Sequence, residues 1–139
     1  MKLLLAFILL IQLPALAQSK DERAIRQLLN EQTLAWNKGN IEQYMQGYWK
    51  SDSLMFIGKS GIHWSWNETL ANYKKGYPDT AAMGKLAFEI IKVKKLSAEY
   101  YYVVGKWMLT RTAGDLSGYY DLLLHKIKGQ WFIIADHSS

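Results

Sequence analysis

The sequence of 139 residues contains no cysteine, two prolines and no long apolar run after its first segment. Without cysteine, the chain has neither disulfides to stabilise it nor a thiol for lipid attachment, so its stability depends on a hydrophobic core. The chain also lacks Pro-rich or Gly/Ser-rich linkers, internal repeats and low-complexity blocks. Together these absences favour a single domain with one core.

Metal-binding and nucleotide-binding patterns are also missing. The three histidines do not lie at ligand spacing from one another, and no glycine-rich phosphate loop, dinucleotide motif or Ser-His-Asp pattern is visible. We therefore expect no metal site and no cofactor. The formal net charge is +5, but the lysines are scattered, with short runs at 74–75 and 92–95. No basic stripe with interleaved aromatic residues occurs, so nucleic acid is not expected as a partner.

The first segment has the layout of a secretory signal peptide. Lys2 gives a short basic start, residues 3–13 are largely apolar, and residues 15–17 form a small-x-small cleavage pattern. An N-terminal membrane anchor is the alternative, but the apolar run is too short to span a bilayer comfortably. We predict that residues 1–17 are a signal peptide and that residues 18–139 form the mature domain. The mature protein is then periplasmic or secreted in a bacterium, with no membrane attachment.

Helical signals come first along the chain, and strand signals dominate its second half. Ser19 can cap the first helix, and capping boxes open the second and third. Turn signals separate the later segments, which are rich in β-branched and aromatic residues. The expected elements are helices over 19–38, 40–48 and 65–76, short strands over 54–57 and 62–64, and long strands over 86–93, 99–111, 117–127 and 130–137.

This order predicts an α+β fold in which three helices pack on one face of an antiparallel meander. Several strands are apolar on both faces, so the face away from the helices also needs cover. A second copy of the chain in a homodimer is the simplest cover. The sequence also contains six Trp and nine Tyr. Aromatic surface beyond the needs of a small core can line a ligand cavity or fill a subunit interface.

A two-residue turn at residues 128–129 sets the expected register of the last two strands. It places Asp121 opposite Asp136, and the same reasoning across the preceding loop places Trp107 opposite Asp121. The shared face also carries Gly105, where a helix can approach closely. We therefore assign this face to the helix side, which is also the side of a cavity.

Several polar and aromatic side chains belong to this predicted site. Two neighbouring carboxylates, Asp121 and Asp136, require a proton or a nearby cation, and Arg111 has the parity to supply the cation. Tyr119 lies on the same face. A register slip of one residue would put His137 inside instead, so both Asp136 and His137 stay candidates.

Asp136 is the strongest candidate for an acid or base, because burial among aromatic rings raises a carboxyl pKa towards the range useful for proton transfer. The alternative is a structural carboxylate that caps backbone or pairs with Arg111. His137 either moves protons beside Asp136 or ties the chain end to a neighbouring loop. His63 lies before the third predicted helix, near the mouth of the cavity. The aromatic residues expected to line the cavity are Trp107, Tyr48 and Trp64.

Six stretches of the chain form a recognisable series. They are AWNKGNIEQYMQGYW (35–49), LMFIG (54–58), YKKGYPD (73–79), MGKL (83–86), VGKWMLTR (104–111) and GQWFIIADHSS (129–139). Through them the chain resembles the NTF2-like superfamily, and within it the small bacterial domains of the DUF4440 and SnoaL-like type. The resemblance implies a cone-shaped α+β domain with a pocket between the helices and a strongly curved sheet. It also implies frequent homodimers joined through the sheet.

The resemblance does not fix a reaction, because the superfamily includes ketosteroid isomerases, polyketide cyclases and dehydratases, nuclear transport factors and a kinase-association domain. Three functions therefore stay open. The first is binding of a small, mostly apolar organic molecule, positioned by Asp136, Arg111 and an aromatic wall. The second is a cofactor-independent isomerase, cyclase or dehydratase in which Asp136, with His137, moves a proton. The third is a homo-oligomeric assembly module without catalysis. We favour binding, because the sequence offers one acid–base group and no obvious second.

Overall fold

The first helix lies across the sheet, and its own sequence determines where it begins and which face it buries. A computed structural model describes residues 18–139, so the predicted signal peptide lies outside the described residues. α1 spans Lys20–Asn37 and begins where the Ser19 hydroxyl accepts a hydrogen bond from the Glu22 amide at 3.1 Å. The buried residues of α1 recur at helical spacing and turn one face towards the sheet. They are Ile25, Leu29, Gln32, Ala35 and Trp36.

Six strands form one sheet in the order β2-β1-β6-β5-β4-β3. Their bounds are β1 Met55–Gly58, β2 Gly61–Trp64, β3 Lys85–Lys95, β4 Tyr100–Thr110, β5 Leu116–Ile127 and β6 Gln130–Ser138. Neighbouring strands are antiparallel except β1 and β6, which pair in parallel. The predicted meander is therefore confirmed for β3 to β6. The parallel pairing of β1 with β6 was not predicted.

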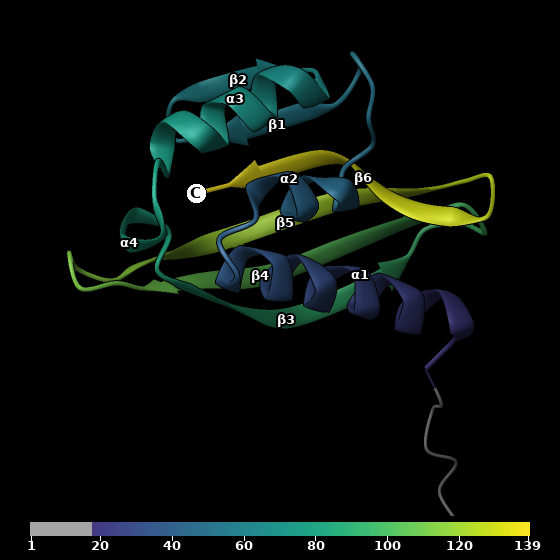
Figure 1. Ribbon diagram of the computed structural model, residues 1–139. Coiled ribbons are helices and arrows are strands. Elements are labelled where there is room, and N and C mark those ends of the chain that lie inside the picture. Colours follow the sequence, from purple (N-terminus) through teal and green to yellow (C-terminus); the bar gives the residue numbers. More distant parts are fainter. Residues whose placement is uncertain (1–17) are drawn as a thin grey trace, which may run out of the picture.

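The helices cover one face of this sheet. α1 and the short α2 (Ile41–Tyr44), which continues into a 3-10 helix over Met45–Gly47, lie in front of the long strands, and α3 (Trp66–Gly76) lies beside β1 and β2 (Figure 1). α4 (Thr80–Met83) leads into β3. The predicted α+β fold, with three helices on a curved sheet, is confirmed, and α4 is an additional turn of helix. Within residues 18–139, no helix is long and apolar enough to cross a membrane.

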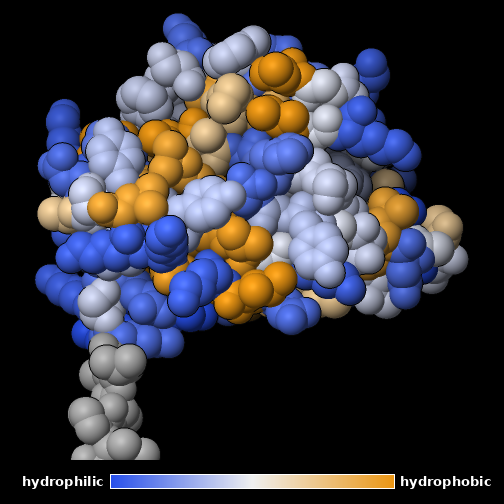
Figure 2. All heavy atoms as spheres, turned by 180° about the vertical axis from the view of Figure 1, so that it is seen from behind, coloured by the Kyte–Doolittle hydropathy of each residue, from blue (hydrophilic) through white to orange (hydrophobic). Residues whose placement is uncertain are grey.

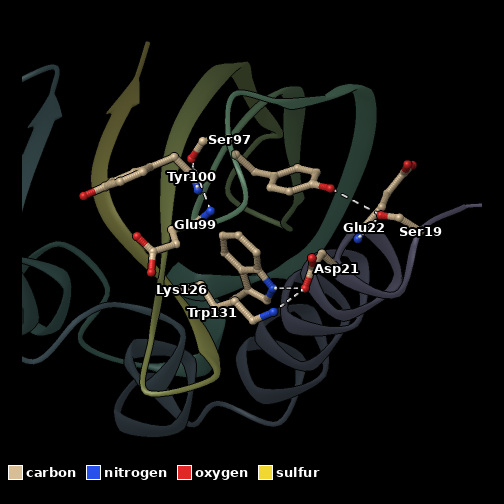
Figure 3. A network of polar contacts seen from close by, with 9 residues as sticks. Ser19, Asp21, Glu22, Ser97, Glu99, Tyr100, Lys126 and Trp131 are labelled. Carbon is tan, nitrogen blue, oxygen red and sulfur yellow. Dashed lines mark hydrogen bonds and ion pairs between the residues drawn. The ribbon is translucent and has the colours of Figure 1, made fainter.

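Polar contacts fix both ends of α1. At the N-terminal end, Asp21 accepts hydrogen bonds from Lys126 Nζ at 2.9 Å and from Trp131 Nε1 at 3.1 Å (Figure 3). The hydrogen bond from Lys126, followed by that from Trp131, lowers the pKa of Asp21. At the other end, Trp36 Nε1 donates to the Met83 carbonyl at 3.1 Å. These contacts hold the helix across the long strands.

The pairing of β4 with β5 differs from the predicted one. Gly105 lies opposite Tyr120, and Trp107 lies opposite Gly118. The prediction that Trp107 faces Asp121 is therefore wrong. Because side chains alternate along a strand, this displacement by an odd number of residues turns β5 over relative to the prediction. Tyr120 faces the helices, and Asp121 faces outward.

The cause is the tight loop between β4 and β5. The Arg111 amide donates to the Asp115 carboxylate at 2.9 Å, which closes the loop early. Leu109 consequently pairs with Leu116, whereas the predicted register paired Leu109 with Tyr119. A carboxylate that accepts a backbone hydrogen bond within a loop is a local detail that strand periodicity does not reveal.

A β-bulge in β6 decides where Asp136 points. On β5, Leu123 and Leu124 are adjacent, but they pair with Ala135 and Ile133 on β6. Ile134 is therefore an extra residue between the two partners. The bulge reverses the alternation of the residues that follow it. Asp136 is therefore buried on the inner face and 5% exposed, while His137 is exposed on the outer face.

Candidate functional site

A cavity of about 880 Å³ lies between the helices and the inner face of the sheet. Its wall is mainly aromatic and aliphatic, as is typical of sites for small organic molecules. The lining residues at its deep end are buried, and those at its mouth are exposed. The buried lining residues are Leu29, Gln32, Trp36, Tyr44, Tyr48, Phe56, Leu86, Leu109, Tyr120, Leu122, Ile133 and Asp136.

Asp136 supplies the one carboxylate side chain among the described lining residues. Its Oδ2 accepts a hydrogen bond from the Tyr48 hydroxyl at 2.7 Å, and its Oδ1 accepts one from Ser138 Oγ at 2.8 Å. Burial raises the pKa of Asp136 to about 6, although both hydrogen bonds oppose the rise. The carboxylate is therefore mostly ionised at neutral pH and close to its titration range, which suits a general base.

Two tyrosine hydroxyls extend the contacts of Asp136 towards the helices. Tyr48 Oη lies 2.7 Å from Asp136 Oδ2 and 3.4 Å from Tyr73 Oη. Burial, followed by the negative charge of Asp136, raises the pKa of Tyr48 well above its usual range. Burial and the neighbouring Tyr44 raise the pKa of Tyr73 in the same direction. Both hydroxyls therefore stay protonated near neutral pH and can donate hydrogen bonds.

Two further donors line the cavity and have no acceptor within residues 18–139. They are the hydroxyl of Tyr120, a residue that is 4% exposed, and the indole Nε1 of Trp107. A Cβ atom at Gly105 would lie 2.3 Å from Tyr120 Oη, so glycine leaves the room in which the Tyr120 ring lies against β4. A buried donor without an acceptor costs free energy, so these groups are suited to an oxygen of a bound molecule.

The mouth of the cavity is basic. Lys59 in the β1–β2 turn, Lys75 near the end of α3 and Arg111 after β4 line it. Figure 1 shows that these three segments lie at the same end of the molecule as the C-terminal end of β6. Arg111 donates from Nε to the Gly114 carbonyl at 2.9 Å and from Nη1 to the Ala82 carbonyl at 3.3 Å. These two bonds fix the guanidinium group, and no carboxylate among residues 18–139 forms an ion pair with it.

The structure brings some of the residues predicted from the sequence together at this cavity. Those that line it are Asp136, Tyr48, Trp107 and Arg111. Asp121 and His137 instead face outward and contact each other, with His137 Nδ1 3.3 Å from Asp121 Oδ1. The predicted carboxylate pair is therefore wrong, because the turned-over β5 and the bulge in β6 place the two aspartates on opposite faces.

Three other predicted residues do not line the cavity. Tyr119 is 59% exposed on the outer face, because β5 is turned over relative to the predicted register. Trp64 is 54% exposed on the edge strand β2. His63 is held by local contacts, with Nε2 2.9 Å from Ser60 Oγ and Nδ1 3.3 Å from Glu68 Oε1. His63 thus ties β2 to the first turn of α3.

Sequence reasoning missed Tyr120, Lys59 and Lys75 as lining residues. A signal for Tyr120 existed in Gly105, because a glycine inside a long strand leaves space for a large side chain on the neighbouring strand. The register error gave that place to Asp121. No equivalent signal marks the two lysines, whose positions depend on where a turn and a helix end meet. Among the described residues, no group of three or more His, Asp or Glu side chains could hold a metal ion.

Several solved structures share this fold. An NTF-2 like protein of unknown function from Shewanella oneidensis MR-1 matches with a TM-score of 0.81 and 45% sequence identity, over 84% of this chain and 97% of that chain. A ketosteroid isomerase-like protein from Erwinia carotovora atroseptica matches with a TM-score of 0.68 and 19% identity, over 88% of this chain and 97% of that chain.

A nuclear transport factor 2 (NTF2-like) superfamily protein from Salmonella enterica serovar Typhimurium matches with a TM-score of 0.66 and 17% identity, over 84% of this chain and 88% of that chain. The Erwinia and Salmonella proteins show a likeness of fold alone, because their sequence identities are low. No family model and no curated protein matches the chain.

Proposed function

The chain belongs to the NTF2-like superfamily, and we propose that its cavity binds a small, mostly apolar, ring-containing organic molecule. The observation that carries the proposal is the cavity of about 880 Å³, with an aromatic wall and buried polar groups at its deep end. Apolar walls supply affinity by removing the ligand from water, and a few placed polar groups fix its orientation. Asp136 and Tyr120 are those groups.

The packing of the aromatic wall supports the proposal. Trp36 contacts Tyr44 and Tyr77 edge to face, with ring centroids 5.1 Å and 4.9 Å apart, and Tyr44 contacts Tyr73 at 5.4 Å in the same way. Such contacts hold the rings in place before a ligand arrives. A preformed wall keeps the entropy cost of binding low.

The test uses N-phenyl-1-naphthylamine, an uncharged aromatic probe that fluoresces in apolar surroundings. We expect saturable binding and about tenfold weaker affinity in Trp107→Ala, which removes a wall residue from the cavity. Trp64→Ala is the matched control, because it removes a tryptophan that lies outside the cavity. Circular dichroism checks the fold of both variants. Absence of saturable binding, or equal weakening by both substitutions, would overturn the proposal.

The buried carboxylate supports a second candidate, which is proton transfer on the bound ligand. A carboxylate with a pKa of about 6 in an apolar cavity is suited to remove a proton from a carbon next to a carbonyl group. Tyr120 Oη and Trp107 Nε1, which lack acceptors among the described residues, could stabilise the negative charge that develops on the carbonyl oxygen. An isomerase, cyclase or dehydratase of this kind needs no cofactor.

The probe for this second candidate is 3-cyclohexen-1-one, whose isomerisation to the conjugated 2-cyclohexen-1-one is followed by ultraviolet absorbance. Asp136 would take a proton from C2 and return it at C4. We expect the rate to rise as the pH passes through about 6, where the carboxyl group of Asp136 ionises. The Asp136→Asn variant should not accelerate the reaction. If the protein does not accelerate the reaction over buffer, the catalytic candidate fails while the binding proposal stands.

Two further expectations remain proposals. We propose that residues 1–17 direct export and that the chain is of the DUF4440 and SnoaL-like type. The basic start, the short apolar run and the small-x-small pattern support export. Expression of the full sequence in a bacterium should give a periplasmic or secreted product whose measured mass corresponds to a chain starting at Gln18. An uncleaved product in the cytoplasmic fraction would contradict it.

A further inference from the structure

Charge is unevenly distributed along the cavity. The deep end holds the buried carboxylate of Asp136, and the mouth carries Lys59, Lys75 and Arg111. From this separation we infer that the ligand is an organic anion, with an apolar ring body inside the cavity and a carboxylate or sulfonate group at the mouth. The inference rests on the proposed binding function and adds the chemical class of the ligand.

The cations at the mouth have no acidic partner within the part of the chain that the structure describes. No ion pair there involves Lys59, Lys75 or Arg111, whereas the neighbouring Lys74 pairs with Glu42. Unpaired cations around the opening of an apolar cavity concentrate the field there and attract an anion. The charge pattern thus favours a ligand that supplies the missing negative charge.

Arg111 is the best-placed of the three cations. Its Nε and Nη1 bonds to the Gly114 and Ala82 carbonyls fix the guanidinium group without neutralising it. A Cβ atom at Gly84 would lie 2.3 Å from Arg111 Cγ, so the absence of a side chain there leaves room for the arginine stem. Gly84 also has a φ of +62°, which glycine adopts without strain. A guanidinium group held in this way can bind a carboxylate or sulfonate oxygen directly.

The deep end of the cavity sets the orientation of the ligand. Ionised Asp136 would repel a second negative charge, so the anionic group stays at the mouth. Tyr120 Oη, a buried donor without an acceptor among residues 18–139, lines the inner wall. Tyr120 and Asp136 are diagonal neighbours across β5 and β6, because Tyr120 pairs with Ser138 and Leu122 with Asp136. The inner end of the ligand therefore carries an uncharged oxygen, such as a carbonyl or hydroxyl group.

The test compares two probes that share one ring system. 8-Anilinonaphthalene-1-sulfonate is N-phenyl-1-naphthylamine with one added sulfonate, and mutual displacement verifies that both occupy the same site. We expect the sulfonate to bind about tenfold more tightly in about 10 mM NaCl, with the advantage shrinking towards about 500 mM, because salt screens exposed charges. The uncharged probe should show no comparable dependence on salt.

Substitutions locate the effect. Lys59→Gln with Lys75→Gln should weaken the sulfonate about three- to fivefold, and adding Arg111→Gln should remove its advantage, while the uncharged probe changes less than about twofold. A triple variant with Lys20→Gln, Lys92→Gln and Lys94→Gln removes the same net charge away from the cavity and is the control. The double variant Lys59→Gln with Lys75→Gln keeps Arg111. The effect can therefore be measured even if the added Arg111→Gln substitution breaks the loop contacts of Arg111 and unfolds the protein.

The outcomes separate the two proposals. If the uncharged probe binds and the sulfonate binds no better, the anion inference is overturned and the binding function stands. The control variant could instead weaken binding of the sulfonate as much as the variant with all three mouth substitutions does. Overall charge would then be responsible, and the anion inference would also be overturned. If neither probe binds, the binding function itself fails.

Discussion

At the residue scale, the buried carboxylate of Asp136 ties the proposed chemistry to a stability cost that depends on pH. Its pKa is raised from 3.8 to about 6 in the folded chain, mainly because burial disfavours the charged form. Each pKa unit corresponds to about 1.4 kcal/mol, so ionisation costs the folded state about 3 kcal/mol. The cost is absent below about pH 4, where the carboxyl group is protonated in both states. It grows between about pH 4 and about pH 6, where the group is ionised in the unfolded chain only, and it is complete above about pH 6.

Asp136→Asn should remove this dependence, because an amide does not titrate. We expect the free energy of unfolding of the variant, relative to the wild type, to rise by about 3 kcal/mol between about pH 4 and about pH 7. Urea unfolding at several pH values gives the two curves. Asp52→Asn, which makes the same change at an exposed carboxylate in a loop away from the cavity, is the matched control. A difference between Asp136→Asn and wild type that stays constant with pH would contradict the assigned burial of Asp136.

The position of the Tyr120 ring depends on the absence of a side chain at Gly105. A methyl group at Gly105 would meet Tyr120 Oη at 2.3 Å and the backbone oxygen of Glu89 at 2.6 Å. The tyrosine ring cannot stay in place, and the backbone contact also has to open. We expect Gly105→Ala to lower the unfolding free energy by about 1–3 kcal/mol, as overpacking does, and to weaken the uncharged probe. Gly76→Ala is the control for stability, because a Cβ atom there has no neighbour within 4 Å. Equal stability of the two variants would rule out the tight contact.

At the element scale, α1 depends on its N-terminal contacts with the sheet. Asp21 accepts hydrogen bonds from Lys126 and Trp131, and these lower its pKa. A lowered carboxyl pKa adds stability above the unfolded pKa of 3.8, and this stability is lost as the pH falls through the folded pKa. Asp21→Ala should therefore lower the unfolding free energy by about 1 kcal/mol near neutral pH.

The pH dependence distinguishes this role of Asp21 from a change in helix propensity. The destabilisation by Asp21→Ala should disappear in strong acid, where the wild-type carboxyl group is protonated as well. Glu31→Ala changes an exposed carboxylate of the same helix, which accepts a hydrogen bond from Gln27 Nε2 at 3.0 Å, and should have little effect on stability. Thermal unfolding at matched pH values measures both variants. A loss in Asp21→Ala that persists in acid would point away from the ion pair.

The elements themselves were largely predictable from the sequence, because their signals are local. The N-caps at Ser19 and Ser65 and the turn at 128–129 all occur where the sequence predicts them. The predicted capping box at Ser65 is completed differently, because Glu68 Oε2 accepts from the Trp64 amide. The bulge at Ile134 carries no such signal. It lies in an apolar run in which neither glycine nor proline marks an irregularity, and either alternation of the run would bury apolar side chains. The register of β6, and with it the inward direction of Asp136, is set by this bulge and not by the residue pattern.

At the scale of the whole molecule, the fold class could be predicted while the site could be predicted in part. Hydrophobic periodicity and element order determine how layers pack, and they tolerate small register errors. A site does not tolerate them, because one residue of slip exchanges inner and outer side chains. The strand ends of β4 and β6 still placed Arg111 and Asp136 among the candidates. Lys59 and Lys75 at the mouth were not predicted, because the β1–β2 turn and the end of α3 come together only in the complete fold.

The outer face of the sheet is the remaining large-scale feature, and we propose that it joins two copies of the chain. Side chains of Val104, Leu123 and Ile134 lie half-buried on it, and Tyr119 is 59% exposed. Figure 2 shows this side of the molecule, with groups of apolar side chains set among charged ones. Strands of about 11 residues are about 36 Å long and about 4.8 Å apart, so β3 to β6 offer roughly 700 Å² per copy, close to what a stable interface uses.

We expect the wild-type protein to sediment as a dimer and Leu123→Lys to sediment as a monomer, because a buried lysine at the centre of the interface loses its hydration without gaining a partner. Leu123 points away from the cavity, so the uncharged probe should bind the monomer as it binds the dimer. Leu34→Lys is the control, since Leu34 is 51% exposed on α1 and lies away from the sheet face; it should leave the dimer intact. Sedimentation equilibrium over a range of concentrations measures all three proteins. A monomeric wild type, or a Leu123→Lys variant that remains dimeric, would exclude the sheet face as the interface.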